Sequence, residues 1–360
     1  MVVRVLIVDD SATQRRLCRS TLAKDPRLSV IGEAADPFEA RALIKALRPD
    51  VLTLDIEMPG MNGLEFLRRI MRLRPMPVVM LSNRTPAGCD AALEALSLGA
   101  VDCLAKTRDA FCPGPAGLAD RLVVAAAIRP GLIARSRVIH PIAPAFRWNG
   151  KIVLVGASTG GVEALEQVFS AFPANCPPVM VTQHMPASYL ARFAIRLDKA
   201  LRPSVRLAQA GMRVEPGNIY LAPGGNTHLI LGRGAGLTLK LQPHDRDTGH
   251  CPSVEVMFAS ARHLAPQVVA VMLTGMGRDG ATAMAALHDA GARCLAQDEA
   301  SSTVFGMPGA AIAAGAVERV LPLAELAVEI LTLTGADQEP RATRFFDGGT
   351  RKEGPRRARP

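Results

Sequence analysis

The sequence predicts an α/β protein of two consecutive domains, each with a mostly parallel sheet covered by helices on both faces. Its 360 residues, of which 49% are hydrophobic, suffice for two domains of ordinary size. Apolar strand-like runs alternate with helix-like segments over residues 1–106 and again from residue 151, and a proline-containing stretch separates the two series. The runs are continuously apolar, as expected of parallel strands buried on both faces.

The first domain is predicted to span residues 1–128. Its expected strands are 3–8, 29–34, 51–54, 77–81 and 101–105, and its expected helices are 11–23, 38–47, 63–73, 89–98 and 118–128. Ser11 is a suitable N-cap for the first of these helices. Residues 129–149, which contain Pro130, Pro141 and Pro144, are predicted to form a linker.

The second domain is predicted to span residues 150–335 and to be larger and doubly wound. Its expected strands are 152–156, 178–183, 205–208, 218–222, 227–231, 237–241, 268–273 and 293–296. Its expected helices are 161–172, 189–200, 253–263 and 280–290, followed by C-terminal helices that run to about residue 334.

Composition narrows the class of protein. The seven cysteines form no C-x-x-C pair, which indicates reduced thiols rather than a disulfide framework. Neither a signal peptide nor an apolar run of membrane-spanning length is present, so the cytosol is the expected location. Over half of the net charge of +9 lies in the Gly- and Pro-rich residues 341–360, within a predicted tail of residues 336–360. This stretch predicts a disordered basic tail, with nucleic-acid binding as the disfavoured alternative.

Polar residues follow four predicted strands of the first domain. Asp9 and Asp10 end the first strand, Asp55 ends the third, Ser82 follows the fourth and Lys106 the fifth. Because strand carboxyl ends meet at one edge of a parallel sheet, these side chains are expected to converge there. Clustered carboxylates favour a hard divalent cation such as Mg²⁺, and a carboxylate beside that cation and a lysine can attack a phosphoryl group. Any one of these aspartates could alone be a cap, but the set together favours a site.

This region closely resembles the receiver domains of two-component response regulators. The resemblance rests on residues 8–11, on residues 54–63, on Ser82 and on Lys106. It implies a flavodoxin-like (βα)5 fold in which Asp55 accepts phosphate from a histidine kinase. It also implies that Asp9, Asp10, Asp55 and the Glu57 main chain hold Mg²⁺, and that Ser82 and Lys106 sense the phosphoryl group.

Two positions depart from the receiver pattern. Thr107 stands where receivers usually have proline, and Cys103 stands where they usually have an aromatic residue. Metal binding and phosphoryl acceptance do not depend on these positions, but the aromatic part of the usual receiver switch does.

A second motif opens the second domain. Residues 156–161, GASTGG, join a strand to a helix and fit the G-x-S-x-G turn that exposes a nucleophilic serine, here Ser158. Ser158 or Thr159 could instead cap the helix, or the loop could bind a dinucleotide phosphate. A dinucleotide site would need an acidic residue after the next strand, and His184 stands there. The ordinary α/β-hydrolase order places the acid before the histidine.

The strand-end acid of the second domain, Asp279, follows His184 in the chain, so the order is Ser158, His184, Asp279. This order excludes the ordinary hydrolase topology but not triad chemistry, which depends on roles rather than order. Asp279 could instead cap the helix that follows, and Asp298 and Glu299 are weaker rivals for its role. A zinc site at His244, His250 and Cys251, with Asp245 and Asp247, is disfavoured by irregular spacing.

Residues 151–334 resemble the catalytic domain of the chemotaxis protein-glutamate methylesterases. The matching stretches are residues 155–165, 182–186, 220–223, 253–258, 273–280 and 296–308. The resemblance implies hydrolysis of glutamate methyl esters and deamidation of glutamines on methyl-accepting chemotaxis receptors, with Ser158, His184 and Asp279 as triad. It suggests Thr159 and Met276 main-chain N–H groups as the oxyanion hole, a chemotaxis histidine kinase as phosphodonor, and no cofactor for the esterase step.

The linker suggests that the receiver can lie over Ser158 and that phosphorylation of Asp55 biases it away. Two alternatives stand beside this function. The second domain could be a non-catalytic scaffold that only binds receptors, or a nucleotide-binding domain under receiver control. The histidine in place of a ribose-binding acid already counts against the second alternative.

Overall fold

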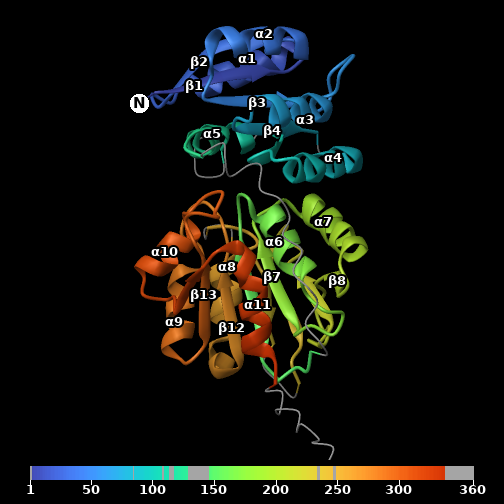
Figure 1. Ribbon diagram of the computed structural model, residues 1–360, viewed down its shortest axis with the longest axis vertical. Helices are drawn as coiled ribbons and strands as arrows, with labels where there is room; N and C mark the ends of the chain where they lie inside the picture. The colour runs from blue at the N-terminus through green and yellow to red at the C-terminus, as the bar shows by residue number, and fades with distance from the viewer. Residues whose placement is uncertain are drawn as a thin grey trace, which may run out of the picture.

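A computed structural model describes residues 2–83, 85–107, 109–112, 117–128, 146–232, 236–245 and 249–336. The chain forms two α/β bodies, one above the other in Figure 1. Most of the predicted linker, and residues 337–360 of the predicted basic tail, lie outside the described residues.

The first body contains a parallel sheet with strand order β2-β1-β3-β4-β5. Its strands are β1 (Val3–Val8), β2 (Leu28–Ala34), β3 (Val51–Asp55), β4 (Val78–Ser82) and β5 (Asp102–Ala105). Its helices are α1 (Ala12–Leu22), α2 (Pro37–Leu47), α3 (Gly63–Leu73), α4 (Pro86–Ser97) and α5 (Leu118–Ala126), with a 3-10 turn at Asp109–Phe111. Ser11 caps α1 by accepting from the Gln14 N–H, as predicted.

The second body contains a parallel sheet with strand order β14-β13-β12-β6-β7-β9-β8. Its strands are β6 (Ile152–Ala157), β7 (Val179–Gln183), β8 (Ser204–Leu207), β9 (Asn218–Leu221), β12 (Val268–Met272), β13 (Arg293–Gln297) and β14 (Arg319–Leu321). Its helices are α6 (Gly161–Ser170), α7 (Ala187–Ala200), α8 (Val254–Ser260), α9 (Ala281–Asp289), α10 (Met307–Ala313) and α11 (Leu323–Thr334). The predicted fold class is therefore confirmed for both bodies.

Three features of the second body differ from the sequence-based expectation. Strands β10 (Thr227–Leu231) and β11 (Leu239–Pro243) pair with each other as an antiparallel hairpin outside the large sheet. The helix predicted over 253–263 ends as α8 at Ser260 and continues as a 3-10 segment, Arg262–Gln267, which contains Pro266. The C-terminal region, predicted as helices alone, contains β14, which is too short and exposed to carry a strand pattern.

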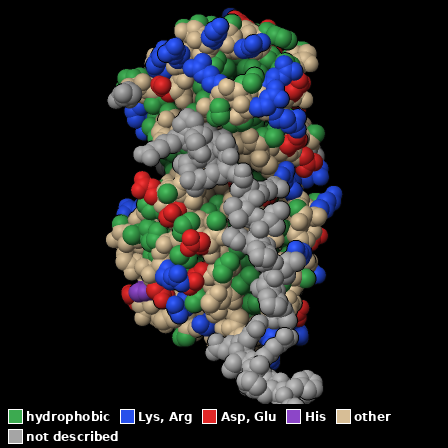
Figure 2. Space-filling model, viewed as in Figure 1, with side chains coloured by type: hydrophobic (Ala, Val, Ile, Leu, Met, Phe, Trp, Pro, Cys, Tyr) green, Lys and Arg blue, Asp and Glu red, His purple; other side chains and the backbone are tan. Residues whose placement is uncertain are grey.

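The two bodies pack directly against each other. Leu93 of α4 belongs to the apolar core of the second body, whereas Tyr189 of α7 belongs to an apolar core of the first. Arg196 of α7 also donates a hydrogen bond to Ser97 of α4. Figure 2 shows many Lys and Arg side chains over the outer end of the first body. The interface is built mainly from α4, which packs against α7 and α6. Residues of β5 and α5 face the ends of β6 and β7 across a cavity.

Candidate functional site

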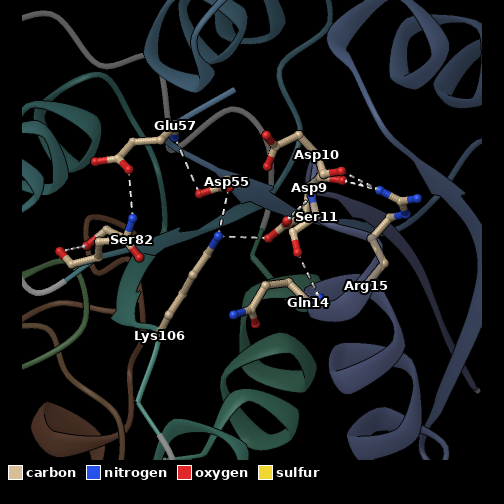
Figure 3. A network of polar contacts seen from close by, with 10 residues as sticks. Asp9, Asp10, Ser11, Gln14, Arg15, Asp55, Glu57, Ser82 and Lys106 are labelled. Atoms are coloured by element: carbon tan, nitrogen blue, oxygen red, sulfur yellow. Dashed lines mark hydrogen bonds and ion pairs between the residues drawn. The ribbon is translucent and has the colours of Figure 1, made fainter. Parts of the chain in front are cut away.

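The predicted polar cluster of the first body assembles at the carboxyl edge of its sheet. Asp9 follows β1, Asp55 is the last residue of β3, Ser82 is the last of β4, and Lys106 follows β5. Because β1 and β4 both flank β3, the chain positions these side chains around Asp55 (Figure 3).

Lys106 lies between two carboxylates of this cluster. Its Nζ is 2.7 Å from Asp55 Oδ2 and 2.9 Å from Asp9 Oδ2. The other Asp9 oxygen accepts from the Ser11 N–H at 2.9 Å, which fixes its orientation. Asp9 and Asp55 are buried, whereas Asp10 is exposed. One ammonium therefore faces two buried carboxylates, and the edge keeps an excess of negative charge.

Burial and pairing shift the pKa values of this cluster. Burial raises the pKa of Asp55 above the ordinary carboxyl range, and the nearby Lys106 ammonium only partly offsets it. Burial alone would lower the pKa of Lys106, but the Asp55 and Asp9 carboxylates raise it above its usual value. Lys106 therefore stays charged at neutral pH.

Asp9, Asp10 and Asp55 fit a divalent cation. They offer carboxylate oxygens that all lie within 4.8 Å of one another. Oxygen ligands of this kind suit a hard ion such as Mg²⁺. The Glu57 carboxylate accepts instead from Asn83 Nδ2 at 2.7 Å, while the Glu57 N–H lies 3.4 Å from Asp55 Oδ1. Glu57 therefore meets Asp55 through its main chain, and its side chain is engaged elsewhere.

Ser82 has a partner that sequence reasoning missed. Its Oγ forms a short hydrogen bond with the Tyr189 hydroxyl of the second body. The Cys103 thiol contacts the same serine side chain. Tyr189 was predicted only as the start of a helix, and a contact between residues 107 positions apart leaves no local signal.

Ser158 lies in the turn between β6 and α6, near the middle of the large sheet. Its N–H donates to the Thr274 carbonyl at 3.0 Å, and its own carbonyl accepts from Gln183 Nε2 at 2.8 Å. Gly160 has φ +81°, a left-handed conformation that favours glycine. A Cβ on Gly275 would lie 2.8 Å from Ser158 Cβ, so that glycine allows the two loops to approach closely. The predicted tight turn is therefore present.

His184 and Asp279 follow the two strands that flank β6. His184 comes directly after β7, and Asp279 lies in the loop between β12 and α9. His184 Nε2 lies 2.8 Å from Asp279 Oδ2. Nε2 therefore carries the proton that this carboxylate accepts, and Nδ1 is the basic nitrogen. Nδ1 is buried and has no hydrogen-bond partner within the described chain.

Asp279 is held by α8 rather than capping the helix that follows it. Its Oδ1 accepts from Ser253 Oγ at 2.9 Å and from the Glu255 N–H at 3.2 Å, and its Oδ2 accepts from the Val254 N–H at 2.7 Å. Burial would raise the pKa of this carboxyl, but His184 and these donors lower it below its usual value. Asp279 is therefore ionised and fixed in place.

His250, which the sequence analysis named only in the disfavoured zinc site, has a contact that sequence reasoning missed. Its ring stacks on the His184 ring with centroids 4.3 Å apart and an interplanar angle of 20°. Burial and the neighbouring His184 lower the pKa of His250 to about 4, so its ring is neutral at neutral pH. The stacked His250 ring therefore covers one face of the His184 ring.

The disfavoured zinc site has a different composition in the structure. Histidines 228 and 244 and Cys251 bring their ligand atoms within 4.8 Å of one another, whereas His250 faces His184. His228 Nδ1 accepts from the Ser253 N–H at 3.1 Å, so its Nε2 carries the proton and donates to His244 Nδ1 at 3.0 Å. A metal ion on Nε2 would require either an imidazolate or loss of the hydrogen bond from the Ser253 N–H, which disfavours zinc at this cluster.

The first body covers the Ser158 turn. A cavity of about 550 Å³ is lined by Ser158, Thr159 and His184 on one side and by Asp102 and Arg121 on the other. Thr159 Oγ1 donates to Asp102 Oδ2 at 3.3 Å, and Arg121 pairs with the same carboxylate. Ser158, His184 and the first body therefore meet at one cavity, whereas Asp279 and Met276 are not among the residues that line it.

Comparisons with known proteins agree with this architecture. The model of the CheB methylesterase family matches residues 153–330, and that of the response regulator receiver domain matches residues 5–110. A protein-glutamate methylesterase/protein-glutamine glutaminase 1 of Caulobacter vibrioides is 50% identical over 339 residues, covering 93% of this chain and 98% of that protein. A protein-glutamate methylesterase/protein-glutamine glutaminase of Agrobacterium fabrum is 48% identical over 345 residues, covering 94% and 98%. The solved catalytic domain of the Thermotoga maritima CheB methylesterase is 34% identical, with a TM-score of 0.50, covering 52% of this chain and 100% of that domain.

Proposed function

Because this chain belongs to the family of protein-glutamate methylesterases/protein-glutamine glutaminases, we propose that it acts on methyl-accepting chemotaxis receptors under the control of phosphorylation at Asp55. The chain is a methylesterase/glutaminase with a receiver domain. The proposal assigns residues 1–128 to the receiver, 129–149 to a linker, 150–335 to the catalytic domain and 336–360 to a tail. Within the described residues, no helix is both long and apolar enough to cross a bilayer. The proposal also places the reaction in the cytoplasm, where the family's receptor substrates and kinase would meet the enzyme.

The observation that supports the esterase mechanism is the hydrogen bond between His184 and Asp279. It leaves Nδ1, the basic nitrogen of His184, without a hydrogen-bond partner in the described chain. Ser158 Oγ attacks the ester carbonyl of a receptor glutamate and gives its proton to His184 Nδ1. Asp279 orients the ring and stabilises the imidazolium that forms. The imidazolium then protonates the departing methanol, and water attacks the acyl-serine to release free glutamate. With a glutamine substrate, ammonia leaves in place of methanol.

The negative charge on the carbonyl oxygen needs donors near Ser158. We assign this role to the Thr159 and Met276 main-chain N–H groups. The N-terminus of α6, whose first N–H groups have no partners within the helix, supports Thr159. Gly275 brings the loop that carries Met276 close to Ser158, which supports the second donor.

Asp55 is the proposed phosphoryl acceptor. One of its oxygens forms the new P–O bond while the P–N bond of a phosphohistidine on the chemotaxis kinase breaks. Asp9, Asp10, Asp55 and the Glu57 main chain would hold Mg²⁺, which would neutralise charge on the transferring group. Lys106 contacts the phosphoryl oxygens as a fixed positive charge, and Ser82 donates its hydroxyl proton to them.

Control follows from the position of the receiver. Asp102 and Arg121 line the cavity that a receptor helix would have to enter, and Asp102 binds the residue next to Ser158. Docked domains therefore exclude a large substrate, and phosphorylation favours the undocked form.

Replacement of Ser158 by alanine tests the esterase mechanism. Methanol release from methylated receptor is expected to fall by about 10⁶-fold, since loss of the nucleophile of a triad has an effect of that order. Ser170→Ala, which removes an exposed hydroxyl bonded to the Gln167 carbonyl, is the matched control and should keep full activity. Undiminished release by Ser158→Ala would refute the mechanism.

A further inference from the structure

His228 is a buried histidine of the catalytic domain that the esterase mechanism does not use. It lies on β10, in the hairpin outside the large sheet, and its side chain is 2% exposed. Its Nδ1 accepts from the Ser253 N–H at 3.1 Å, and its Nε2 donates to His244 Nδ1 at 3.0 Å. Because Ser253 is the N-cap of α8, the His228 ring joins the hairpin to the start of that helix.

The two hydrogen bonds of His228 determine its tautomer. A main-chain N–H can only donate, so Nδ1 carries no proton and Nε2 carries the single proton of a neutral ring. Burial and the neighbouring His244 lower the pKa of His228, and Asp279 acts in the opposite direction. His228 is therefore a neutral ring that offers one acceptor to α8 and one donor to the hairpin.

Ser253 connects His228 to the carboxylate of Asp279. Its N–H donates to His228, and its Oγ donates to Asp279 Oδ1 at 2.9 Å. The same Oγ accepts from the Val256 N–H at 3.3 Å, which caps α8. One residue thus binds His228 through its main chain and Asp279 through its side chain.

The beginning of α8 supplies three of the four hydrogen bonds to Asp279. The donors are Ser253 Oγ, the Val254 N–H and the Glu255 N–H, and the fourth donor is His184. Two of the three are main-chain groups, so their positions depend on where the chain enters the helix. With only seven residues, α8 has little stability of its own and depends on contacts with its surroundings.

Apolar packing holds the same segment from another side. The Val254 side chain fits against two glycines, since a Cβ on Gly156 or on Gly280 would lie 2.4 Å from Val254 Cγ1. Packing of this kind fixes how closely α8 approaches the sheet, whereas a hydrogen bond also fixes direction. The bond from Ser253 to His228 therefore sets the orientation of the turn that carries the Asp279 donors.

We infer that His228 is a positioning residue of the esterase: through Ser253 it orients the first turn of α8, whose donors hold Asp279 where His184 needs it. His228 is not among the residues that line the cavity over Ser158, so it acts without touching the substrate. This inference rests on the proposed role of Asp279 as the triad acid.

Two substitutions in the full chain separate positioning from packing. His228→Asn leaves a carbonyl oxygen near the place of Nδ1, where it can accept from the Ser253 N–H, but it removes much of the ring. His228→Leu fills more of the space and has no acceptor. With methylated receptor as substrate, His228→Leu should lower kcat for methanol release roughly 10²-fold, the effect of a misplacement of about 1 Å, with KM changed less than about twofold.

His228→Asn should lower kcat less than about fivefold, because it keeps the acceptor on which the position of Asp279 depends. His263→Leu is the matched control, since His263 is exposed beyond the end of α8 and should keep full activity. Equal losses in the two His228 variants, or a larger loss in His228→Asn, would show that His228 serves packing alone and overturn the inference.

A double substitution provides an independent arm that does not depend on the stability of the single variants. Because His228 acts through Asp279, adding His228→Leu to Asp279→Asn should lower kcat by less than about a further twofold. Losses that multiply would contradict the inference. If Asp279→Asn alone keeps the wild-type kcat, the assignment of the triad acid fails, and the inference with it. Failure of the esterase activity itself appears separately, as a lack of methanol release by the wild-type chain.

Discussion

The receiver and the catalytic domain each place a buried aspartate at the carboxyl edge of a parallel sheet, yet the two carboxyls differ in pKa. Burial raises the pKa of Asp55 despite Lys106, whereas His184 and the donors of α8 lower that of Asp279 despite burial. Asp55 has one cation that it shares with Asp9, and Asp279 has four donors of its own.

This difference separates two uses of a carboxylate. Asp279 is saturated with hydrogen bonds, so its charge is stable and its position fixed, which suits a residue that orients a base. The charge of Asp55 is only partly neutralised by Lys106, so a bound cation would stabilise this carboxylate more than it would stabilise Asp279. An oxygen of Asp55 is also free to form a bond to phosphorus. The number of donors around each aspartate, rather than burial, distinguishes the two roles.

Of the changes to these two aspartates, removing the charge of Asp279 is expected to have the larger effect. Asp279→Asn should lower kcat for methanol release by about 10⁴-fold, because an amide does not enforce the tautomer that leaves Nδ1 basic. Asp298→Asn is the matched control, since Asp298 binds Ser301 rather than His184 and should keep full activity. If Asp298→Asn were the inactive variant, the assignment of the acid would be reversed.

Removing the charge of Asp55 should affect regulation rather than esterase chemistry. Asp55→Asn should lose stimulation by a small-molecule phosphodonor, a loss of roughly 5- to 150-fold in stimulated methanol release. Chelation of Mg²⁺ should abolish the same stimulation in the wild-type chain. Asp50→Asn provides a control, because Asp50 is exposed and binds the Arg4 N–H at 2.8 Å. Stimulation that survives in Asp55→Asn would place the acceptor elsewhere.

A smaller effect concerns the pH dependence of stability near Asp279. Burial, together with the neighbouring His184 and Arg121, lowers the pKa of His250 from 6.5 to about 4 on folding, and Asp279 acts in the opposite direction. Between those pH values the unfolded state binds the proton and the folded state does not, so the unfolding free energy falls as pH drops from 6.5 to 4 and stays flat below.

Urea denaturation at pH 7 and pH 4.5 measures this dependence. His250→Phe keeps a flat ring but has no proton to bind. Its unfolding free energy should therefore fall between pH 7 and pH 4.5 by roughly 2 kcal/mol less than that of the wild type, a figure reduced because the His250 side chain is partly exposed to solvent. His263→Phe, at an exposed position, should recover none of it. Equal pH dependence in wild type and His250→Phe would show that the histidine protonates freely in the folded protein.

The smallest effect is expected from the surface ion pair between the domains. Arg192 NH1 lies 3.6 Å from Asp90 Oδ2, and both side chains are exposed. Such pairs contribute at most about 0.5 kcal/mol, so Asp90→Ala should change basal methanol release less than about twofold. A clearly larger rise would mean that this surface pair, and not the packing of α4 against α7, holds the domains together.

The strand ends were the part of the site that sequence could predict. Apolar runs mark where strands stop, and Asp55, Ser158, His184 and Asp279 each follow such a run or the loop after it. The structure brings Asp279 to His184 and surrounds Asp55 with Asp9 and Lys106, as the alternation implied.

The contacts between domains could not be predicted in the same way. The sequence pattern predicts only that Tyr189 lies at the start of a helix and that Asp102 lies near the start of a strand. Their partners, Ser82 and Thr159, lie 107 and 57 positions away, and no periodicity encodes a separation of that kind. The stack of His250 on His184 was missed for the same reason, since a loop residue carries no strand or helix pattern.

The cavity over Ser158 has walls from both domains, and this composition has a pharmacological consequence. A small molecule that contacts both Asp102 and Ser158 binds the docked form and has no complete site on the undocked one. Binding of the molecule and phosphorylation of Asp55 are thermodynamically linked. If phosphorylation lowers the affinity of the protein for the molecule by some factor, the bound molecule lowers the equilibrium constant for phosphorylation of Asp55 by the same factor. An inhibitor of this kind would reduce both ester hydrolysis and phosphorylation of Asp55, without reacting with Ser158.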